Sequence, residues 1–148
     1  LLAAMAGDSE VMRILVSGGA DPELTTDDGT TPLMVAAGLG RYAAENLVTE
    51  KGTLDSVGVA LELGADVNAV NAVGNTALHA AAHIKYDALV QLLVDRGAKL
   101  NASNSRAETP LMLADRFRAG SGNVHVRTST GNLLRSLGAE ETGSVPVR

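Results

Sequence analysis

One short segment recurs along this chain and limits how it can fold. Its clearest copy starts with Gly-Asn-Thr-Ala-Leu-His at residues 74–79 and closes at residues 97–98 with Gly-Ala. Thr-Pro-Leu at residues 31–33 and 109–111 repeats the start, and Gly-Ala followed by an acidic residue at 19–21, 64–66 and 138–140 repeats the end. Because a single copy cannot bury its apolar face alone, the copies are predicted to stack into one solenoid.

Each copy carries the signals of two short helices. A threonine followed by proline suits a helix start, since Thr caps the first turn and Pro needs no intrahelical donor. The third copy predicts one helix from about Thr76 to Ile84 and another from about Asp87 to Arg96. Glycines after each second helix accept the left-handed conformation that ends a helix. The first copy is truncated, with Asp8 or Ser9 as the expected cap of its second helix.

Two copies are longer than the others. The starts at Thr31 and Thr76 are 45 residues apart, whereas those at Thr76 and Thr109 are 33 apart, so the second copy holds an insertion at about residues 41–52. The fourth copy breaks at residues 119–123, and the second helices are expected to resume near Thr53 and Thr130. One hypothesis is that both insertions pack together, with Tyr42, Leu47 and Val48 as their apolar part. The alternative is two unrelated loops.

The pattern predicts an all-α solenoid of about four helix–turn–helix repeats in one domain, residues 1–141. The repeats are expected at about residues 1–25, 26–70, 71–103 and 104–141, with 142–148 as a tail.

These motifs resemble the ankyrin repeat, a unit of about 33 residues built from two helices and a turn. Thr-Ala-Leu-His at residues 76–79 and Gly-Ala-Asp-Val-Asn-Ala at 64–69 carry the resemblance, which extends over residues 1–141. The turn Asp of the family is Thr26, Asn71 and Asn104 here, and the turn Gly of the last copy is Ala107. This last change leaves the shape of the final hairpin open.

The sequence offers no constellation for catalysis. His79 and His83 have the spacing of a zinc-binding helix, but the accompanying Glu and a third ligand are missing. In the family that the chain resembles, the histidine at the position of His79 is structural. No nucleophile has a base partner, and the chain contains no cysteine. We therefore expect no enzyme activity, no cofactor and no metal.

The resemblance implies a protein-binding module that uses its concave face. The expected contact residues are Asp27, Asp28, Val70, Ala72, Val73, Asn75, His83, Ile84, Ser105, Arg106, Arg116 and Phe117. Val70, Ala72, Val73 and Ile84 are apolar where solvated residues are expected, which suggests a partner. Alternatively, neighbouring tips cover one another. Two other functions stay open: a regulatory or targeting module of a larger enzyme, and a subunit that self-associates through its first repeat.

Charge and hydropathy narrow the class of partner. A formal net charge of −5 argues against nucleic acid and anionic membranes, and no apolar run is long enough to span a bilayer. The chain opens with Leu-Leu-Ala-Ala rather than a signal peptide, and we expect it to be part of a longer protein. A cytoplasmic location is favoured, with the bacterial periplasm or secretion as alternatives if an upstream signal exists.

Overall fold

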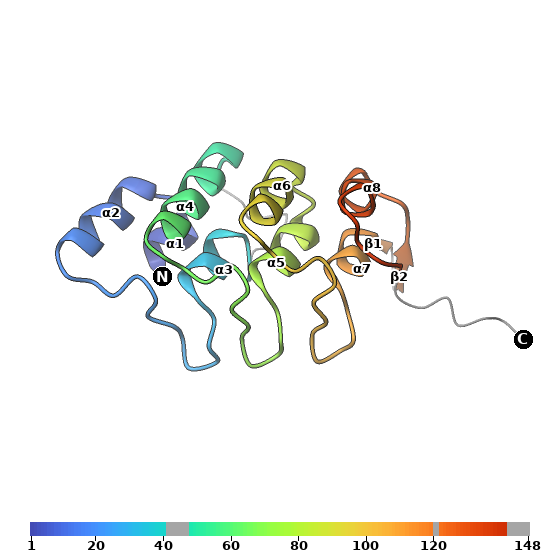
Figure 1. Ribbon diagram of the computed structural model, residues 1–148, viewed down its shortest axis with the longest axis horizontal. Helices are drawn as coiled ribbons and strands as arrows, with labels where there is room; N and C mark the ends of the chain where they lie inside the picture. The colour runs from blue at the N-terminus through green and yellow to red at the C-terminus, as the bar shows by residue number, and fades with distance from the viewer. Residues whose placement is uncertain (41–47, 120–121, 142–148) are drawn as a thin grey trace, which may run out of the picture.

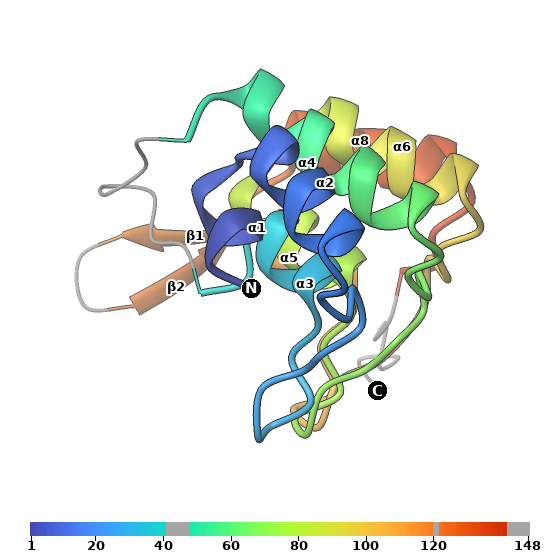
Figure 2. The same ribbon diagram turned by 90° about the vertical axis from the view of Figure 1, so that its left-hand side faces the viewer.

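The computed structural model describes residues 1–40, 48–119 and 122–141, and they form a row of helix pairs (Figure 1). The pairs are α1 (Leu2–Ala6) with α2 (Ser9–Ser17), α3 (Pro32–Ala36) with α4 (Glu50–Glu62), α5 (Ala77–Ile84) with α6 (Asp87–Asp95), and α7 (Pro110–Ala114) with α8 (Ser129–Ser136). The first and second helices form two separate layers, from which hairpin loops project on one side (Figures 1 and 2). The predicted all-α repeat solenoid is confirmed.

The helix starts follow from side-chain caps. Threonine hydroxyls accept the amide hydrogen of the residue three positions on at Thr31, Thr49, Thr76, Thr109 and Thr128. Asp8 caps α2 in the same way, with 3.0 Å between its Oδ1 and the amide nitrogen of Val11. The start expected near Thr53 was wrong: Thr49 caps α4, so this helix begins at Glu50 and the insertion contributes its first turn.

The core runs without interruption between the two layers. Leu33, Leu78, Leu89, Leu93 and Leu134 are completely or almost completely buried. Alanines fill the first helices, where α5 packs between α3 and α7, because a small side chain lets helices approach closely. Each pair therefore depends on its neighbours for burial, as expected of a repeat array.

The hairpin tips are joined to one another by hydrogen bonds. The Ala72 amide donates to the Asp28 carbonyl at 2.7 Å, and the Ser105 amide donates to the Val73 carbonyl at 2.9 Å. Asn104 adds a side-chain link, because its Nδ2 donates to the Asn75 Oδ1 at 2.9 Å. An aspartate could not donate this bond, so the asparagine at this turn position connects repeats as well as closing its own loop.

The last hairpin keeps the shape of the others. Ala107 adopts a φ of 57°, close to the 76° of Gly74 at the same position in the preceding tip. The Asn104 amide donates to the Glu108 carbonyl at 3.0 Å, just as the Asn71 amide donates to the Asn75 carbonyl at 3.2 Å. Alanine in place of the turn glycine therefore does not change the shape of the hairpin, although its Cβ makes the left-handed conformation of Ala107 strained.

The insertion in the last repeat contains two short strands that the sequence did not predict. Strands β1 (Arg116–Ala119) and β2 (Gly122–His125) pair antiparallel, with Arg116 opposite His125. Figure 2 shows this hairpin beside the helix layers rather than within them. The Val126 amide then donates to the Asp115 carbonyl at 2.8 Å and returns the chain to α8.

The proposed packing of the two insertions on each other stays a prediction. Tyr42 and Leu47 lie outside the described residues. Val48 is described, and its side chain covers Gly7 of the first repeat, where an added Cβ would collide with it. Val48 therefore contributes to the packing of the second repeat on the first. In the part of the chain that the structure describes, no helix has the length and hydropathy needed to cross a membrane.

A groove between the hairpin tips and the first helices

A groove of about 290 Å³ lies where the last two hairpin tips meet the helix layer. We call it the tip groove. Its lining comes from five segments. These are Gly38, Leu39 and Gly40 after α3; Val73 and Asn75 of the second tip; His79, Ala80 and His83 of α5; Asn104, Ser105, Arg106 and Glu108 of the third tip; and Leu113 and Arg116 after the start of α7. Residues from three repeats thus meet there, which no single copy of the unit could bring together.

The structure brings together half of the expected contact residues and separates the rest. The groove contains Val73, Asn75, His83, Ser105, Arg106 and Arg116. Outside it, Asp27, Asp28, Val70 and Ala72 lie exposed on the two earlier tips. Phe117 is described only through its backbone in β1.

Ile84 is less accessible than expected. It is half-buried and packs against the core. Its Cδ1 would lie 2.9 Å from a Cβ added at Gly38, so its side chain covers the end of the preceding first helix. The expectation of a solvated Ile84 was wrong because Gly38 follows the first helix of the preceding repeat. The missing side chain of this glycine leaves space for the side chain of Ile84. Its apolar character therefore has a structural explanation.

An ion pair organises the polar side of the groove. Arg116 pairs with Glu108, whose other oxygen accepts from Asn104 Nδ2 at 3.1 Å. Asn104 Oδ1 in turn accepts from the amides of Arg106 and Glu108, at 2.9 and 3.0 Å. Burial alone would raise the pKa of Glu108, but the bonds from Asn104 and Arg116 outweigh it and hold that pKa below its usual value. Asn104 was not among the contact residues expected from the sequence.

His79 forms the floor of the groove. It is buried, its Nε2 lies 3.1 Å from the Glu108 carbonyl oxygen, and its Nδ1 lies 3.1 Å from the Thr76 amide nitrogen. The carbonyl requires a donor and the amide requires an acceptor, so the ring is neutral with its proton on Nε2. Burial lowers the pKa of His79, consistent with this form. The histidine holds a loop, which is the structural role that the resemblance implied.

The acidic tip differs from the groove in charge. Asp27 and Asp28 are exposed on the first tip. Hydrogen bonds from Thr26 and Thr30 lower the pKa of Asp28, so its carboxylate is ionised. Three tips thus present different chemistry in order: acidic residues, then Val70, Ala72 and Val73, then Ser105 and Arg106.

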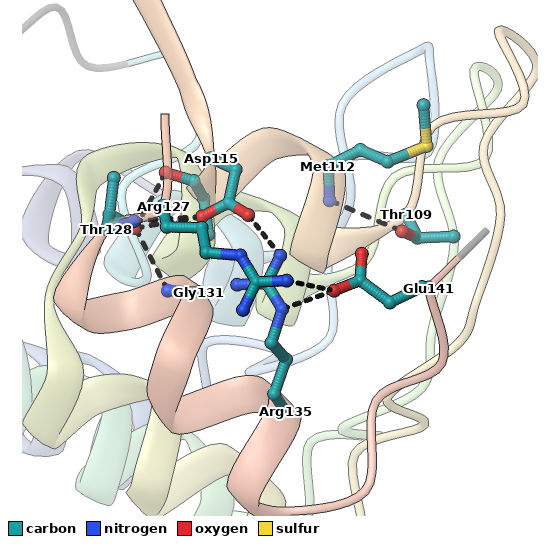
Figure 3. Close-up of polar contacts among 9 residues, drawn as sticks. Thr109, Met112, Asp115, Arg127, Thr128, Gly131, Arg135 and Glu141 are labelled. Carbon is teal, nitrogen blue, oxygen red and sulfur yellow. Dashed lines mark hydrogen bonds and ion pairs between the residues drawn. The ribbon is translucent and has the colours of Figure 1, made fainter. Parts of the chain in front are cut away.

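A second polar cluster fastens the last helix (Figure 3). Asp115 pairs with Arg135 at 2.5 Å and accepts the Thr128 amide at 3.1 Å. Arg135 also pairs with Glu141 at 2.6 Å, and Arg127 lies 3.6 Å from the same carboxylate. Because both carboxylates of the cluster pair with Arg135, we read this cluster as structural, although Arg135 Nη1 is buried there without a hydrogen-bond partner. In the described residues, no three His, Asp or Glu side chains are grouped as a metal ion requires.

Known proteins share this repeat. The family model for ankyrin repeats (3 copies) matches residues 42–124. Neurogenic locus notch homolog protein 1 is 37% identical to this chain in the human protein and 38% identical in that of Xenopus tropicalis, each over 116 residues. Human NF-kappa-B inhibitor alpha is 35% identical over 101 residues.

These alignments cover most of this chain but little of the relatives. They include 77% of the chain for both notch proteins and 68% for the inhibitor, yet only 4% and 30% of those proteins' own length. The family model covers more than half of the chain. The chain belongs to the ankyrin repeat family.

Proposed function

We propose that this chain is a non-enzymatic module that binds a protein partner through its hairpin tips and the tip groove. Ankyrin repeats generally mediate protein–protein interaction. The observation that carries the proposal is the exposure of Val70 and Val73, two residues of the second tip that are 60% and 43% accessible. Apolar residues held together in solvent are typical of a contact surface.

The competing explanation is that neighbouring tips cover one another. The tips do meet, through the bonds from the Ala72 amide to the Asp28 carbonyl and from the Ser105 amide to the Val73 carbonyl. These bonds join main chains and leave both valine side chains exposed. They also hold the tips in place, so a partner would lose little ordering entropy when it binds.

The proposal can be tested by affinity capture from an extract of the source organism. The double variant Val70→Asp with Val73→Asp is compared with the unchanged chain and with Asn132→Asp plus Ser136→Asp, which adds the same two charges at exposed sites of α8. Ile84 is a poor choice for such a variant because it is half-buried. Loss of the captured protein in the tip variant alone supports the proposal. Equal capture by all three chains contradicts it.

The reading as a regulatory or targeting part of a larger enzyme stays open beside this one. The alignments to much longer relatives agree with either, since a repeat array can form a small part of a long chain. The full reading frame distinguishes them, because only the second requires a catalytic domain in the same protein.

A specific observation also favours self-association as a second function. Leu2, Ile14 and Leu15 of the first repeat are 79%, 60% and 49% exposed. Leu15 lies four residues before the closing glycine of its repeat. The same position in the interior repeats is occupied by Ala60 and Leu93, and both are buried. At the other end, the exposed residues of α8 include Asn132 and Ser136, as in a polar terminal repeat.

If no further repeat precedes Leu1 in the whole protein, two apolar first repeats would face each other rather than stack head to tail. Sedimentation equilibrium over a wide concentration range tests this. A dimer that dissociates in Ile14→Lys with Leu15→Lys, but persists in the control Leu24→Lys, supports self-association. Leu24 is 64% exposed and lies in a loop. A monomer at every concentration contradicts it.

A further inference from the structure

We infer that the tip groove takes an acidic segment of the partner, with an apolar side chain next to the acidic residue. This inference rests on the proposed function and specifies the chemistry of its partner. It is carried by a local excess of positive charge in a chain whose formal net charge is −5.

The cations at the groove outnumber the carboxylates. Arg106 and Arg116 line it, and Lys85 borders it by donating from Nζ to the Arg116 carbonyl at 2.8 Å. His83 also lines the groove, but its lowered pKa leaves the ring neutral near pH 7. Glu108 is the only carboxylate among the described residues that line the groove. A negatively charged side chain entering the groove would therefore meet more attraction than repulsion.

The carboxylates nearby are already engaged. Glu108 accepts from Asn104 and pairs with Arg116, with side chains 13% and 22% exposed. Burial lowers the pKa of Lys85 and the charge of Asp115 acts to raise it, but this carboxylate is already paired with Arg135. Arg106 differs, since it is exposed and its guanidinium has no ion-pair partner within the described part of the chain. Arg106 is thus the cation free to bind an incoming carboxylate.

The pKa of His83 agrees with a positive potential. Burial lowers this pKa, and the charges of Lys85 and Arg116 lower it further. These groups disfavour one another's protonation, and an anion placed among them would relieve that repulsion.

The walls of the groove explain why the segment also needs an apolar residue. Leu39, Val73 and Leu113 supply its apolar surface, and Val73 is accessible from solvent. A volume of about 290 Å³ suits a few side chains rather than a whole domain. The two valines of the second tip continue this surface towards the acidic first tip.

An acidic peptide fits better than a nucleic acid. A polyanion needs cations spaced along its length, whereas the cations here are confined to the last two repeats. Asp27 and Asp28 on the first tip would repel a nucleic acid that continued along the array. A segment with a short acidic stretch avoids this repulsion.

Fluorescence anisotropy with a labelled peptide in which Glu residues flank a Leu pair tests the inference. Matched peptides carry Gln or Lys in place of Glu, and a single-stranded RNA serves as the alternative polyanion. The protein variants are Arg106→Glu and the control Arg96→Glu, which makes the same charge change at an exposed site at the end of α6. We expect the Glu peptide alone to bind, and Arg106→Glu to weaken it by about tenfold, with little change in Arg96→Glu.

Equal binding of the Glu and Gln peptides, equal effects of the two variants, or no peptide binding would each overturn the inference. Tighter binding of the RNA would overturn it in favour of a nucleic acid. None of these results decides the proposed function, which stands or falls with the capture by the tip variant. If the tip variant loses its partner while Arg106→Glu keeps it, the surface is correct and the acidic chemistry is wrong.

Discussion

The imidazole of His79 connects two repeats, with its Nε2 3.1 Å from the carbonyl oxygen of Glu108, 29 residues further along the chain. The other ring nitrogen accepts the Thr76 amide at 3.1 Å. One buried side chain therefore closes its own helix start and holds the next hairpin tip. The tip groove depends on this contact, because Glu108 carries the ion pair that shapes its polar side.

This geometry predicts that stability falls when the solution is acidified. Burial lowers the pKa of His79 below its ordinary value of 6.5, so the unfolded chain binds a proton more readily than the folded one. The stabilising contribution is complete above 6.5 and declines as the pH falls from 6.5 towards the folded pKa. Thermal unfolding across this range should show a falling Tm. Because the pKa of His83 is lowered as well, His79→Gln and His83→Gln should each reduce the slope, and the double variant should remove most of it. An unchanged slope in His79→Gln would assign the effect to another group.

Gly131 and Gly58 should respond oppositely to alanine. A Cβ at Gly131 would overlap the Asp115 carboxylate, which Arg135 and Thr128 hold in place, so Gly131→Ala should cost about 2 kcal/mol. Gly58 lies in α4 with nothing within 4 Å of an added Cβ, so Gly58→Ala should stabilise by about 0.5–1 kcal/mol. Urea denaturation measures both, and equal effects would contradict the packing at α8.

The partly buried ion pair at α8 should matter more than an exposed one. Asp115 and Arg135 side chains are 10% and 19% exposed, so Asp115→Ala, which removes one of the two carboxylate partners of Arg135 and the acceptor of the Thr128 amide, should cost about 3 kcal/mol. Glu62 and Arg13 are each 55% exposed, so Glu62→Ala should cost under about 1 kcal/mol. Chemical denaturation of both variants checks the contrast. A small loss for Asp115→Ala would mean that the cluster in Figure 3 contributes little.

Ala107 is a position where a natural residue is strained. Its φ of 57° costs an alanine energy that a glycine does not pay. Ala107→Gly should therefore raise the free energy of unfolding, by up to about 1 kcal/mol after the entropy of the added glycine is subtracted. The matching change in a tip that already has glycine, Gly74→Ala, should destabilise. If both changes destabilise, the last hairpin has a different conformation.

Much of the fold could be predicted because its signals are local. Thr76 caps α5 and its closing turn follows directly, so the predicted helices of the third repeat agree with α5 and α6 to within a residue. The starts of α3 and α7 were predicted in the same way, from Thr31 with Pro32 and from Thr109 with Pro110. In these cases the residues that determine the element lie inside it.

The remaining features depend on neighbours that the local sequence does not reveal. The second helix of this copy was expected to resume near Thr53, yet α4 already includes Gly52, where an added Cβ would lie 3.1 Å from the Gly7 carbonyl oxygen of the first repeat. Ile84 was expected in solvent, but the chain ends α3 with Gly38 and makes room for it. The pairing of Glu108 with Arg116 likewise requires the hairpin tip to return to the helix edge.

The most direct test of the account places a photo-crosslinking amino acid at Val73 in the tip groove and, separately, at Arg96 on the outer layer. Both sites are exposed, so each variant should fold. After irradiation in an extract of the source organism, the account predicts a discrete protein adduct from position 73 and none from position 96. The same adduct from both positions, or an adduct from position 96 alone, would contradict binding at the hairpin tips.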